Sequence, residues 1–480
     1  MLRHRHRAAS AVIIPCLLAM VQAVSAADGV DPAVVPAPAP VPVDAITGTE
    51  ARLEALDQRI RELDHKLEIA QEEASAKSKD APKIKAGAEG FSLSSADDAF
   101  SLRIGGYIHA DGRFYLNDDD RPGTDTFLLR RVRPILDGKL GKHAAFKIMT
   151  DFGGGVASVQ DAYLDLILRP EAQLRVGKFK VPVSVERLQS GTALLFIERA
   201  LPSSLIPNRD IGAIVHGEIH KGAVAYAAGV VNGAVDGGSR DTDVNDDKEG
   251  VARIWLSPFT SSSAEALNGL GVGIGGTYGN DEGTAAATSL PTYRSTGQEI
   301  IFRYVQGVIP TNANTARADG PHYRIVPQLY WTLGAFSVLG EYAISHQEVV
   351  LGGVRDDVTV TAWQAAGAWV LTGERASFKG VVPKQPLDVD KGTWGAFELA
   401  LRVHGLEVED DVFTNGFASR AISASRAIAY GAGLNWYLTR NLKWQANYEV
   451  TRYVDGAADG AGVRDRQDEQ IALTRFQVQF

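Results

Sequence analysis

Residues 427–438 read AIAYGAGLNWYL, so bulky apolar side chains from Ile428 to Leu438 alternate with small or polar ones. A period of two is the pattern of a β-strand whose two faces meet different surroundings. Residues 442–451 repeat the pattern as LKWQANYEVT. A soluble sheet hides such an apolar face in a core, whereas a transmembrane barrel turns it towards lipid and keeps the polar face in water.

The same alternation recurs from about residue 100 to the end of the chain and predicts sixteen strands. An even number of antiparallel strands can close into a barrel, and sixteen strands enclose a water-filled lumen. The predicted fold is therefore all-β, a 16-stranded antiparallel transmembrane β-barrel over residues 100–480. Residues 300–308 also resemble a strand, so the segment 280–321 can add one more pair of barrel strands. We place the strands near 101–116, 126–137, 144–152, 158–168, 172–180, 210–219, 223–231, 249–257, 270–279, 322–332, 336–346, 357–371, 393–405, 423–438, 442–454 and 468–480.

Two features favour an outer-membrane barrel over a soluble sheet. The first is that tight connections at 139–142, 334–335 and 439–441 alternate with long ones. Outer-membrane barrels have short turns at one rim and long loops at the other. The long connections are 117–125, 181–209, 232–247, 280–321 and 455–467.

The second feature is the end of the chain, which reads RFQVQF over 475–480. Its alternation places Phe476, Val478 and Phe480 on one face, and outer-membrane barrels end on a similar strand with a terminal aromatic residue. A free strand of this kind would be prone to aggregate in a soluble protein. We therefore predict that these three residues form a signal for the outer-membrane assembly machinery.

The composition excludes several other classes of protein. The 480 residues carry a formal net charge of -9, whereas nucleic-acid binders usually present a basic surface to phosphate. The single cysteine, Cys16, excludes a disulfide framework and a Cys-ligated metal centre. The histidines form no ligand pair, and no catalytic cluster is readable in the sequence. We therefore expect no metal, no cofactor and no enzymatic activity.

The N-terminal residues predict export. Residues 1–26 have the arginines, the apolar stretch and the small residues before a cleavage site that are typical of a signal peptide. Residues 27–49 are rich in Pro and Ala, which favours an extended spacer. Residues 80–99 are interpreted as a linker to the barrel, and no run of about eighteen apolar residues is present after the signal peptide to form a spanning helix.

Residues 50–79 change to heptad spacing. One helix cannot bury such an apolar seam by itself, so we expect a short periplasmic coiled coil that joins copies of the chain. Dimers and trimers both remain open for a coiled coil of this length. The alternative is a single amphipathic helix that lies on its own protein. The seam residues predicted to drive oligomerisation are Leu53, Leu56, Ile60, Leu63 and Leu67.

An ordered series of short motifs resembles the phosphate-selective porins of the O and P type. The resemblance covers nearly the whole barrel, from about residue 100 to 480. It implies a trimer of sixteen-stranded barrels in the outer membrane, each a passive channel for phosphate or related anions that is narrowed by an inward-folded third loop. The motifs include RRVR at 130–133, QDAY at 160–163, RVGKFK at 175–180, ERL at 186–188, FIER at 196–199, PQLY at 327–330, LTGE at 371–374 and ELALR at 398–402.

Basic residues in these motifs are the candidate anion pathway. An anion that enters a narrow pore loses part of its hydration, and fixed Arg or Lys side chains replace it with charge-assisted hydrogen bonds. Strand alternation predicts that Arg131 and Arg133 point inward, and loop 181–209 contains an apolar run at 194–197 that suits a loop packed inside a barrel. The predicted pathway residues are Arg131, Arg133, Lys147, Arg175, Lys178, Lys180, Arg187, Arg199 and Arg209.

Two alternatives remain open for these residues. The basic side chains can instead pair with inward acids, such as Asp151, Asp161 and Asp165, and brace the barrel wall. Loop 181–209 can instead fold over the rim or pack at a subunit contact.

We predict an outer-membrane porin through which anions, phosphate or polyphosphate, diffuse passively. The expected partners are outer-membrane lipid and lipopolysaccharide, small anions, the assembly machinery and two further copies in a homotrimer, with no nucleic acid. The alternative functions are a general porin, a tether whose coiled coil contacts the cell wall, and a barrel hydrolase.

Overall fold

The computed structural model describes residues 49–117, 119, 123–243, 245–260 and 262–480. The predicted signal peptide and nearly all of the proline-rich spacer lie outside these residues. The chain divides into a unit that ends at Ser78 and a β unit from Lys79 to Phe480. None of the helices in the described part is long and apolar enough to cross a membrane.

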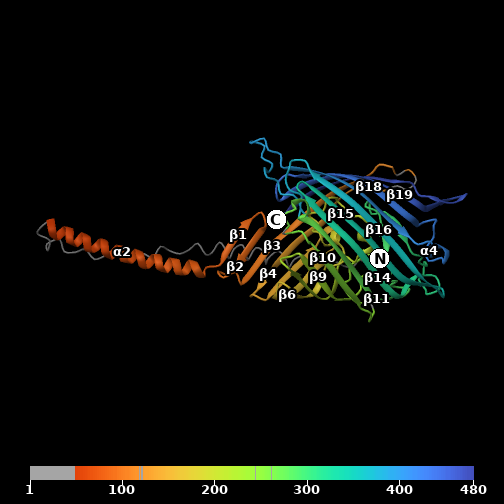
Figure 1. The fold of residues 1–480 in the computed structure, drawn as a ribbon, viewed down its shortest axis with the longest axis horizontal. Coiled ribbons are helices and arrows are strands. Elements are labelled where there is room, and N and C mark those ends of the chain that lie inside the picture. The colour runs from red at the N-terminus through yellow and green to blue at the C-terminus, as the bar shows by residue number, and fades with distance from the viewer. Residues whose placement is uncertain (1–48, 118, 120–122, 244, 261) are drawn as a thin grey trace, which may run out of the picture. The chain divides into compact units, whose positions relative to one another are not determined.

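Among the described residues, sixteen antiparallel strands form a closed barrel of tilted strands (Figure 1). The first barrel strand, β3 (Phe100–Tyr115), pairs with the last, β21 (Glu469–Gln479), and this pairing closes the sheet. The predicted fold class and strand number are confirmed. The strands between them are β4 (Thr126–Leu140), β5 (Ala144–Asp151), β6 (Ser158–Arg169), β7 (Ala172–Phe179), β8 (Asp210–Ile219), β9 (Val224–Val231), β10 (Glu249–Leu256), β11 (Gly269–Glu282), β14 (Arg317–Leu333), β15 (Phe336–Leu351), β16 (Val354–Val370), β17 (Ala396–Val408), β18 (Ala424–Tyr437) and β19 (Leu442–Asp459).

The loop between β11 and β14 adds no strand to the barrel. It contains β12 (Thr292–Arg294) and β13 (Ile300–Arg303), which pair with each other in a separate two-stranded sheet. The further barrel pair that the sequence left open is therefore absent from the described residues.

The connections depart from strict alternation at two places. Strands β10 and β11 are joined at the short-turn rim by residues 257–268, and the second departure lies between β15 and β17. Strands β15 and β16 are longer than predicted and are joined at the long-loop rim by residues 352–353 alone. At the opposite rim, β16 and β17 are joined by residues 371–395, a long connection that the sequence analysis did not identify. We call residues 371–395 the rim segment.

The predicted linker over residues 80–99 instead contains a β-hairpin. Strand β1 (Lys83–Gly87) pairs with β2 (Gly90–Ser94), and β2 pairs with β3 at the short-turn rim. Gly90 has a φ of +91°, and a Cβ there would lie 2.4 Å from the Ile104 carbonyl oxygen. The glycine therefore allows the hairpin to lie close against the first barrel strand.

The outer face of the barrel is apolar. Leu129, Leu399 and Leu401 are among its exposed side chains, and their exposed fractions reach 69%. Phe336 stacks on Trp369, and Phe397 stacks on Trp436, where these strands meet the short-turn rim. An apolar band with aromatic residues at its edge is the arrangement of a barrel in lipid.

The interior is only partly polar, because loops other than the predicted third loop also pack inside the barrel. Inward-facing Val358, Val360, Leu406 and Val408 are at most 2% exposed, because loops of the long-loop rim pack against them. The packed loop residues include Leu205, Phe302 and Phe417. The loops therefore bury their own apolar side chains inside the barrel on the β14–β18 side. Short helices within the described connections are α3 (Val185–Leu188), α4 (Asp411–Thr414) and 3-10 turns at Gly153–Gly155, Leu201–Leu205 and Glu265–Leu267.

Helix α2 (Thr49–Asp80) covers the predicted heptads. Its five seam residues are 54–63% exposed. Self-association of this helix stays a prediction.

Candidate anion-binding site

The third loop, residues 180–209 between β7 and β8, lies inside the barrel rather than over its rim. Side chains of the wall hold its middle part. Lys443 Nζ donates to the Leu194 carbonyl at 3.1 Å, and Arg475 Nη1 donates to the Ile197 carbonyl at 2.9 Å. The Ile197 amide donates to Asn447 Oδ1 at 2.7 Å. These hydrogen bonds tie the loop to β19 and β21 on the far side of the lumen.

Local capping fixes the first part of the same loop. Ser184 Oγ accepts a hydrogen bond from the Arg187 amide at 3.0 Å and donates one to Glu341 Oε1 at 2.7 Å. A serine at this position satisfies an otherwise free amide at the start of a helix. Helix α3 is thereby anchored to β15, and Arg187 is held in a defined position.

Two cavities meet at the third loop. The inner cavity has a volume of about 520 Å³ and is lined mainly by β3–β7 and the third loop. The loop cavity has a volume of about 430 Å³ and is lined by the third loop and by residues 235–238 and 290–298. Four arginines line both cavities, so their guanidinium groups lie where the two cavities meet. The shared arginines are Arg130, Arg131, Arg187 and Arg199.

Eight of the nine predicted pathway residues line the inner cavity. The exception is Lys178, whose ammonium group pairs with Asp241. The described lining of the inner cavity includes nine basic residues but only two acidic ones, Asp151 and Asp161. This surplus gives the cavity a positive potential, although the whole chain is acidic. The eight residues that the structure brings together are Arg131, Arg133, Lys147, Arg175, Lys180, Arg187, Arg199 and Arg209.

The bracing alternative is correct for the basic residues of the wall. Each of them has a carboxylate partner. The pairs are Arg133 Nε with Asp151 Oδ2 at 2.7 Å, Arg175 Nε with Asp165 Oδ1 at 2.7 Å, Arg209 Nε with Asp161 Oδ1 at 2.8 Å and Lys147 Nζ with Asp161 Oδ2 at 3.7 Å.

Three cations of the third loop are different. Lys180 donates to the Gln189 carbonyl at 2.8 Å, and Arg199 donates to the same carbonyl at 2.8 Å and to the Glu186 carbonyl at 3.1 Å. Arg187 donates to backbone carbonyls and to Asn208 Oδ1. None of the three has a described carboxylate oxygen within 4.0 Å. These cations are therefore held by carbonyl groups rather than by direct ion pairs, while Glu186 attracts Arg187 and Arg199 from a greater distance.

Burial lowers the pKa of all three of these cations. Burial, followed by repulsion from Arg199 and Arg209, lowers the pKa of Lys180 well below its ordinary value. A nearby anion favours the charged form of a lysine. Lys180 is therefore a cation that the structure stabilises poorly unless an anion is present.

Arg130 was missed by the sequence analysis because a β-bulge interrupts β4. His109 pairs with Arg131, but the next pair is Ala110 with Leu129, which leaves Arg130 as the extra residue. A bulge of this kind redirects a side chain. Strand alternation placed Arg130 on the outer face, whereas the bulge turns Arg130 and Arg131 to the same side. No local sequence signal reports the bulge.

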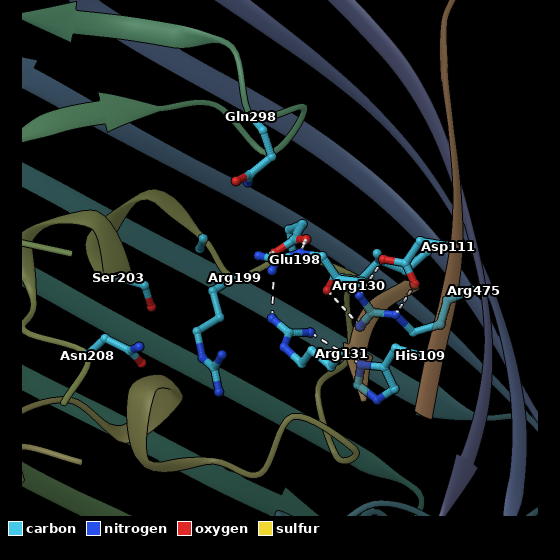
Figure 2. A network of polar contacts seen from close by, with 12 residues as sticks. His109, Asp111, Arg130, Arg131, Glu198, Arg199, Ser203, Asn208, Gln298 and Arg475 are labelled. Carbon is cyan, nitrogen blue, oxygen red and sulfur yellow. Dashed lines mark hydrogen bonds and ion pairs between the residues drawn. The ribbon is translucent and has the colours of Figure 1, made fainter. Parts of the chain in front are cut away.

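Glu198 is shared by three arginines. Its carboxylate lies 2.6 Å from Arg130 Nε, 3.3 Å from Arg113 Nη2 and 3.8 Å from Arg131 Nη2. Figure 2 shows this network, with Arg131 also in contact with His109. Burial raises the pKa of Glu198, but the charges of Arg130 and Arg131 outweigh it, and the net pKa lies well below the ordinary value. One carboxylate among three guanidinium groups leaves the cluster positive.

In the described part of the chain, no group of three or more His, Cys, Asp or Glu side chains is placed to hold a metal ion. The positive charge of the site comes from the arginines and lysines that line the two cavities. These fixed cations can donate hydrogen bonds to an anion.

Comparison with known proteins places this geometry in a family. Residues 102–480 match the family model described as phosphate-selective porin O and P. Porin O of Pseudomonas aeruginosa is 24% identical over 417 residues, which cover 82% of this chain and 91% of that protein.

Solved structures with the same fold include two outer-membrane proteins. The outer-membrane channel DcaP of Acinetobacter baumannii is 11% identical with a TM-score of 0.51, over 80% of this chain and 98% of that one. Outer-membrane-expressed OmpT of Vibrio cholerae is 12% identical with a TM-score of 0.50, over 83% and 100% of the two chains. The family and the fold indicate a channel of the outer membrane rather than an enzyme. With a closed sixteen-stranded barrel and a family match over most of its length, the chain belongs to the phosphate-selective porin O and P family.

Proposed function

We propose that this porin lets anions diffuse passively across the outer membrane, with phosphate or polyphosphate as substrate. One observation carries the proposal: four arginines line both cavities, and two of them, Arg187 and Arg199, have no carboxylate partner among the described residues. An anion that passes from one cavity to the other must cross this group. The third loop is then the constriction of the pore.

The physical basis is local charge. Charges separated by more than roughly 8 Å are largely screened in physiological salt, so the acidic outer loops have little effect on an ion at the third loop. Fixed guanidinium groups replace part of the hydration shell that the ion loses. The net charge of -9 for the whole chain is therefore compatible with anion selectivity.

Arginine chemistry supports phosphate in preference to a spherical anion. The planar guanidinium presents paired N–H donors that match two oxygens of a phosphate group. Beyond the shared arginines, the inner cavity carries Arg133 on β4, Lys147 on β5 and Arg175 on β7. A chain of phosphate groups can contact several of these cations at once, which supports polyphosphate as a substrate.

The test is ion selectivity in planar bilayers. In a potassium chloride gradient, the wild-type zero-current potential should show anion preference, and phosphate should reduce the single-channel chloride current. Arg187→Ala and Arg199→Ala should each lower the anion preference and weaken the phosphate block. Lys178→Ala is the matched control, because Lys178 is basic and nearby but does not line the inner cavity. Cation preference in the wild type, or no change in both arginine variants, would defeat the proposal.

We further propose that α2 lies in the periplasm and joins three copies of the porin. The exposed seam of Leu53, Leu56, Ile60, Leu63 and Leu67 supports self-association, since an apolar stripe of this kind needs a partner helix. The competing role is a tether, in which α2 binds the cell wall and the barrel is only its anchor. Deletion of residues 27–80, which spares the hairpin β1–β2, distinguishes a channel from a tether. The truncated protein should still conduct ions if it is a channel, whereas a tether should lose its function.

A further inference from the structure

A third cavity lies on the other side of the third loop and is mainly apolar. Its volume is about 340 Å³, and it opens between β10, β11, β14 and the rim segment. Trp255, Tyr330 and Phe378 form its aromatic walls, and Leu188 of α3 closes one side. We call this cavity the aromatic pocket. Leu188 also lines the inner cavity, so helix α3 separates the aromatic pocket from the basic pathway.

Glycines of β11 make room for the pocket wall. A Cβ at Gly271 would lie 2.3 Å from the Trp255 ring, and one at Gly273 would lie 2.7 Å from it. Any larger residue at these positions would push the indole away from the sheet. The glycine-rich run of β11 therefore serves to seat Trp255 flat against the barrel wall, where its ring faces the pocket.

The rim segment supplies the third aromatic wall. The Phe378 ring packs edge to face on Tyr330, with centroids 5.1 Å apart and an interplanar angle of 76°. The Phe378 carbonyl accepts a hydrogen bond from Gln189 Nε2 at 2.9 Å. The Gln189 side chain of the third loop thus holds the backbone at Phe378, which positions this ring against Tyr330.

A single cation enters this apolar cavity. Arg253 lines the pocket and lies over the Trp255 ring, with its Cζ 4.9 Å from the ring centroid. Its Nε and Nη2 both donate to Gln328 Oε1, at 3.2 and 3.0 Å. Glu341 attracts it without forming an ion pair, and no described carboxylate oxygen lies within 4.0 Å. Arg253 therefore keeps its charge, and its Nη1 donates to no partner among the described residues.

We propose that the aromatic pocket binds a small organic anion that has one ring and one carboxylate. The ring would lie between Trp255, Tyr330 and Phe378, and the carboxylate would accept from Arg253. The volume is near the lower limit of small-molecule pockets, which fits a single-ring ligand. Inorganic phosphate fits poorly, because one cation faces it and the other walls are apolar. This site is separate from the anion pathway proposed above and does not depend on it.

The test is ligand binding to the full-length protein in detergent, measured by calorimetry with benzoate as the probe. Benzoate should bind saturably, and excess inorganic phosphate should not displace it. Arg253→Gln should weaken binding about tenfold or more, since a charged hydrogen bond is lost. Phe378→Ala should weaken it by a similar factor and lies outside the barrel strands, so it keeps the test valid if the Arg253 variant fails to fold. Heat-modifiable migration on gels checks folding of each variant.

Two controls separate this site from the proposed pathway. Arg175→Gln removes a cation of the inner cavity and should leave benzoate binding unchanged. Benzyl alcohol has the same ring without the charge and should bind much more weakly than benzoate. The inference is overturned if the wild type binds no benzoate, if phosphate displaces it, if Arg175→Gln matches Arg253→Gln, or if benzyl alcohol binds equally well. None of these results bears on whether the porin prefers anions.

Discussion

At the scale of single residues, position relative to the β-bulge decides which arginines can act on a permeating ion. Arg130 and Arg131 are adjacent in sequence, yet both line the two cavities. A second bulge lies in β6. Met149 pairs with Asp161 and Thr150 pairs with Val159, which leaves Gln160 as the extra residue. The two bulges place polar side chains side by side where regular strands would have turned one of them to lipid.

Regular strand alternation would turn Arg130 towards lipid, where its loss would not affect a permeating ion. Because the bulge turns it inward, Arg130→Ala should reduce the anion preference of the channel. Loss of this guanidinium also leaves Glu198 with one fewer cation, so the cluster becomes less positive. We expect phosphate affinity to fall about tenfold, as for one charge-assisted hydrogen bond. Single-channel block by phosphate is the measurement. An unchanged block would show that Arg130 does not reach the ion, with Lys178→Ala as the matched control.

Lys180 gives the pathway a dependence on pH. A lysine is charged below its pKa, and the pKa of Lys180 is lowered by burial and by Arg199 and Arg209. Its charge, and with it part of the anion preference, should be lost as the pH rises through a range below the ordinary value of 10.5. Reversal potentials in a chloride gradient should show this loss, since chloride does not titrate. Lys180→Arg should remove the pH dependence, whereas Lys178→Arg should not. Equal pH profiles for the wild type and Lys180→Arg would contradict the assignment.

At the scale of elements, loops are attached to the wall by buried polar networks. Asp236 of the loop between β9 and β10 accepts from Arg324 Nε of β14 at 2.6 Å and from Tyr293 OH of β12 at 3.0 Å. Arg324 is also paired with Glu249. These contacts hold two long loops at the entrance of the loop cavity.

Acid should release this attachment. Burial raises the pKa of Asp236, but Arg324 outweighs it and the net pKa is lowered from 3.8 to about 2. A lowered pKa stabilises the folded arrangement above about pH 4, and this stabilisation is lost as the pH falls towards 2. Hydrogen exchange of residues 232–248 should therefore rise over that range. Asp236→Asn should show the faster exchange already at neutral pH. Slow exchange in this variant would mean that Asp236 does not hold the loop.

The end of the chain after β21 contributes to the barrel through backbone pairing, and its exposed aromatic ring is the predicted assembly signal. The Phe480 amide and carbonyl pair with Gly106, while its ring is 43% exposed on the outer face beside Phe476 and Val478. Phe480→Ala keeps the backbone pairs, so the stability of the purified barrel should change little. The yield of folded porin in cells should fall if the assembly machinery reads this ring. Phe127→Ala, which removes an exposed aromatic ring from β4, is the control. Equal yields for the two variants would argue against an assembly signal.

At the scale of the whole molecule, the water-filled space is displaced to one side of the barrel. Loops and inward apolar residues fill the β14–β18 side, and the basic residues of the inner cavity lie on β4, β5, β7 and the third loop. Under the proposed function, permeating ions would be confined to the side of the barrel where these cations lie.

Self-association is a prediction at the same scale. Leu56→Glu with Leu63→Glu should abolish association through α2, because charged side chains cannot be buried in a coiled-coil seam. Gln58→Glu with His65→Glu adds acidic residues at positions outside the seam and should leave association intact. Chemical cross-linking and sedimentation of the purified porin are the measurements. Unchanged association in the seam variant would locate the subunit contacts elsewhere.

The sequence by itself determined the barrel, its strand number and most of the basic residues that line the inner cavity. These features follow from alternation along a strand, which is a local property of the chain. Arg133, Lys147 and Arg175 could be assigned to the interior for this reason. The tertiary structure alone decided that Arg130 also faces the lumen, that the wall cations are paired while Lys180, Arg187 and Arg199 are not, and that loops fill the β14–β18 side of the interior. Bulges, ion pairs and docked loops depend on residues that are distant in sequence, and no local period reports them.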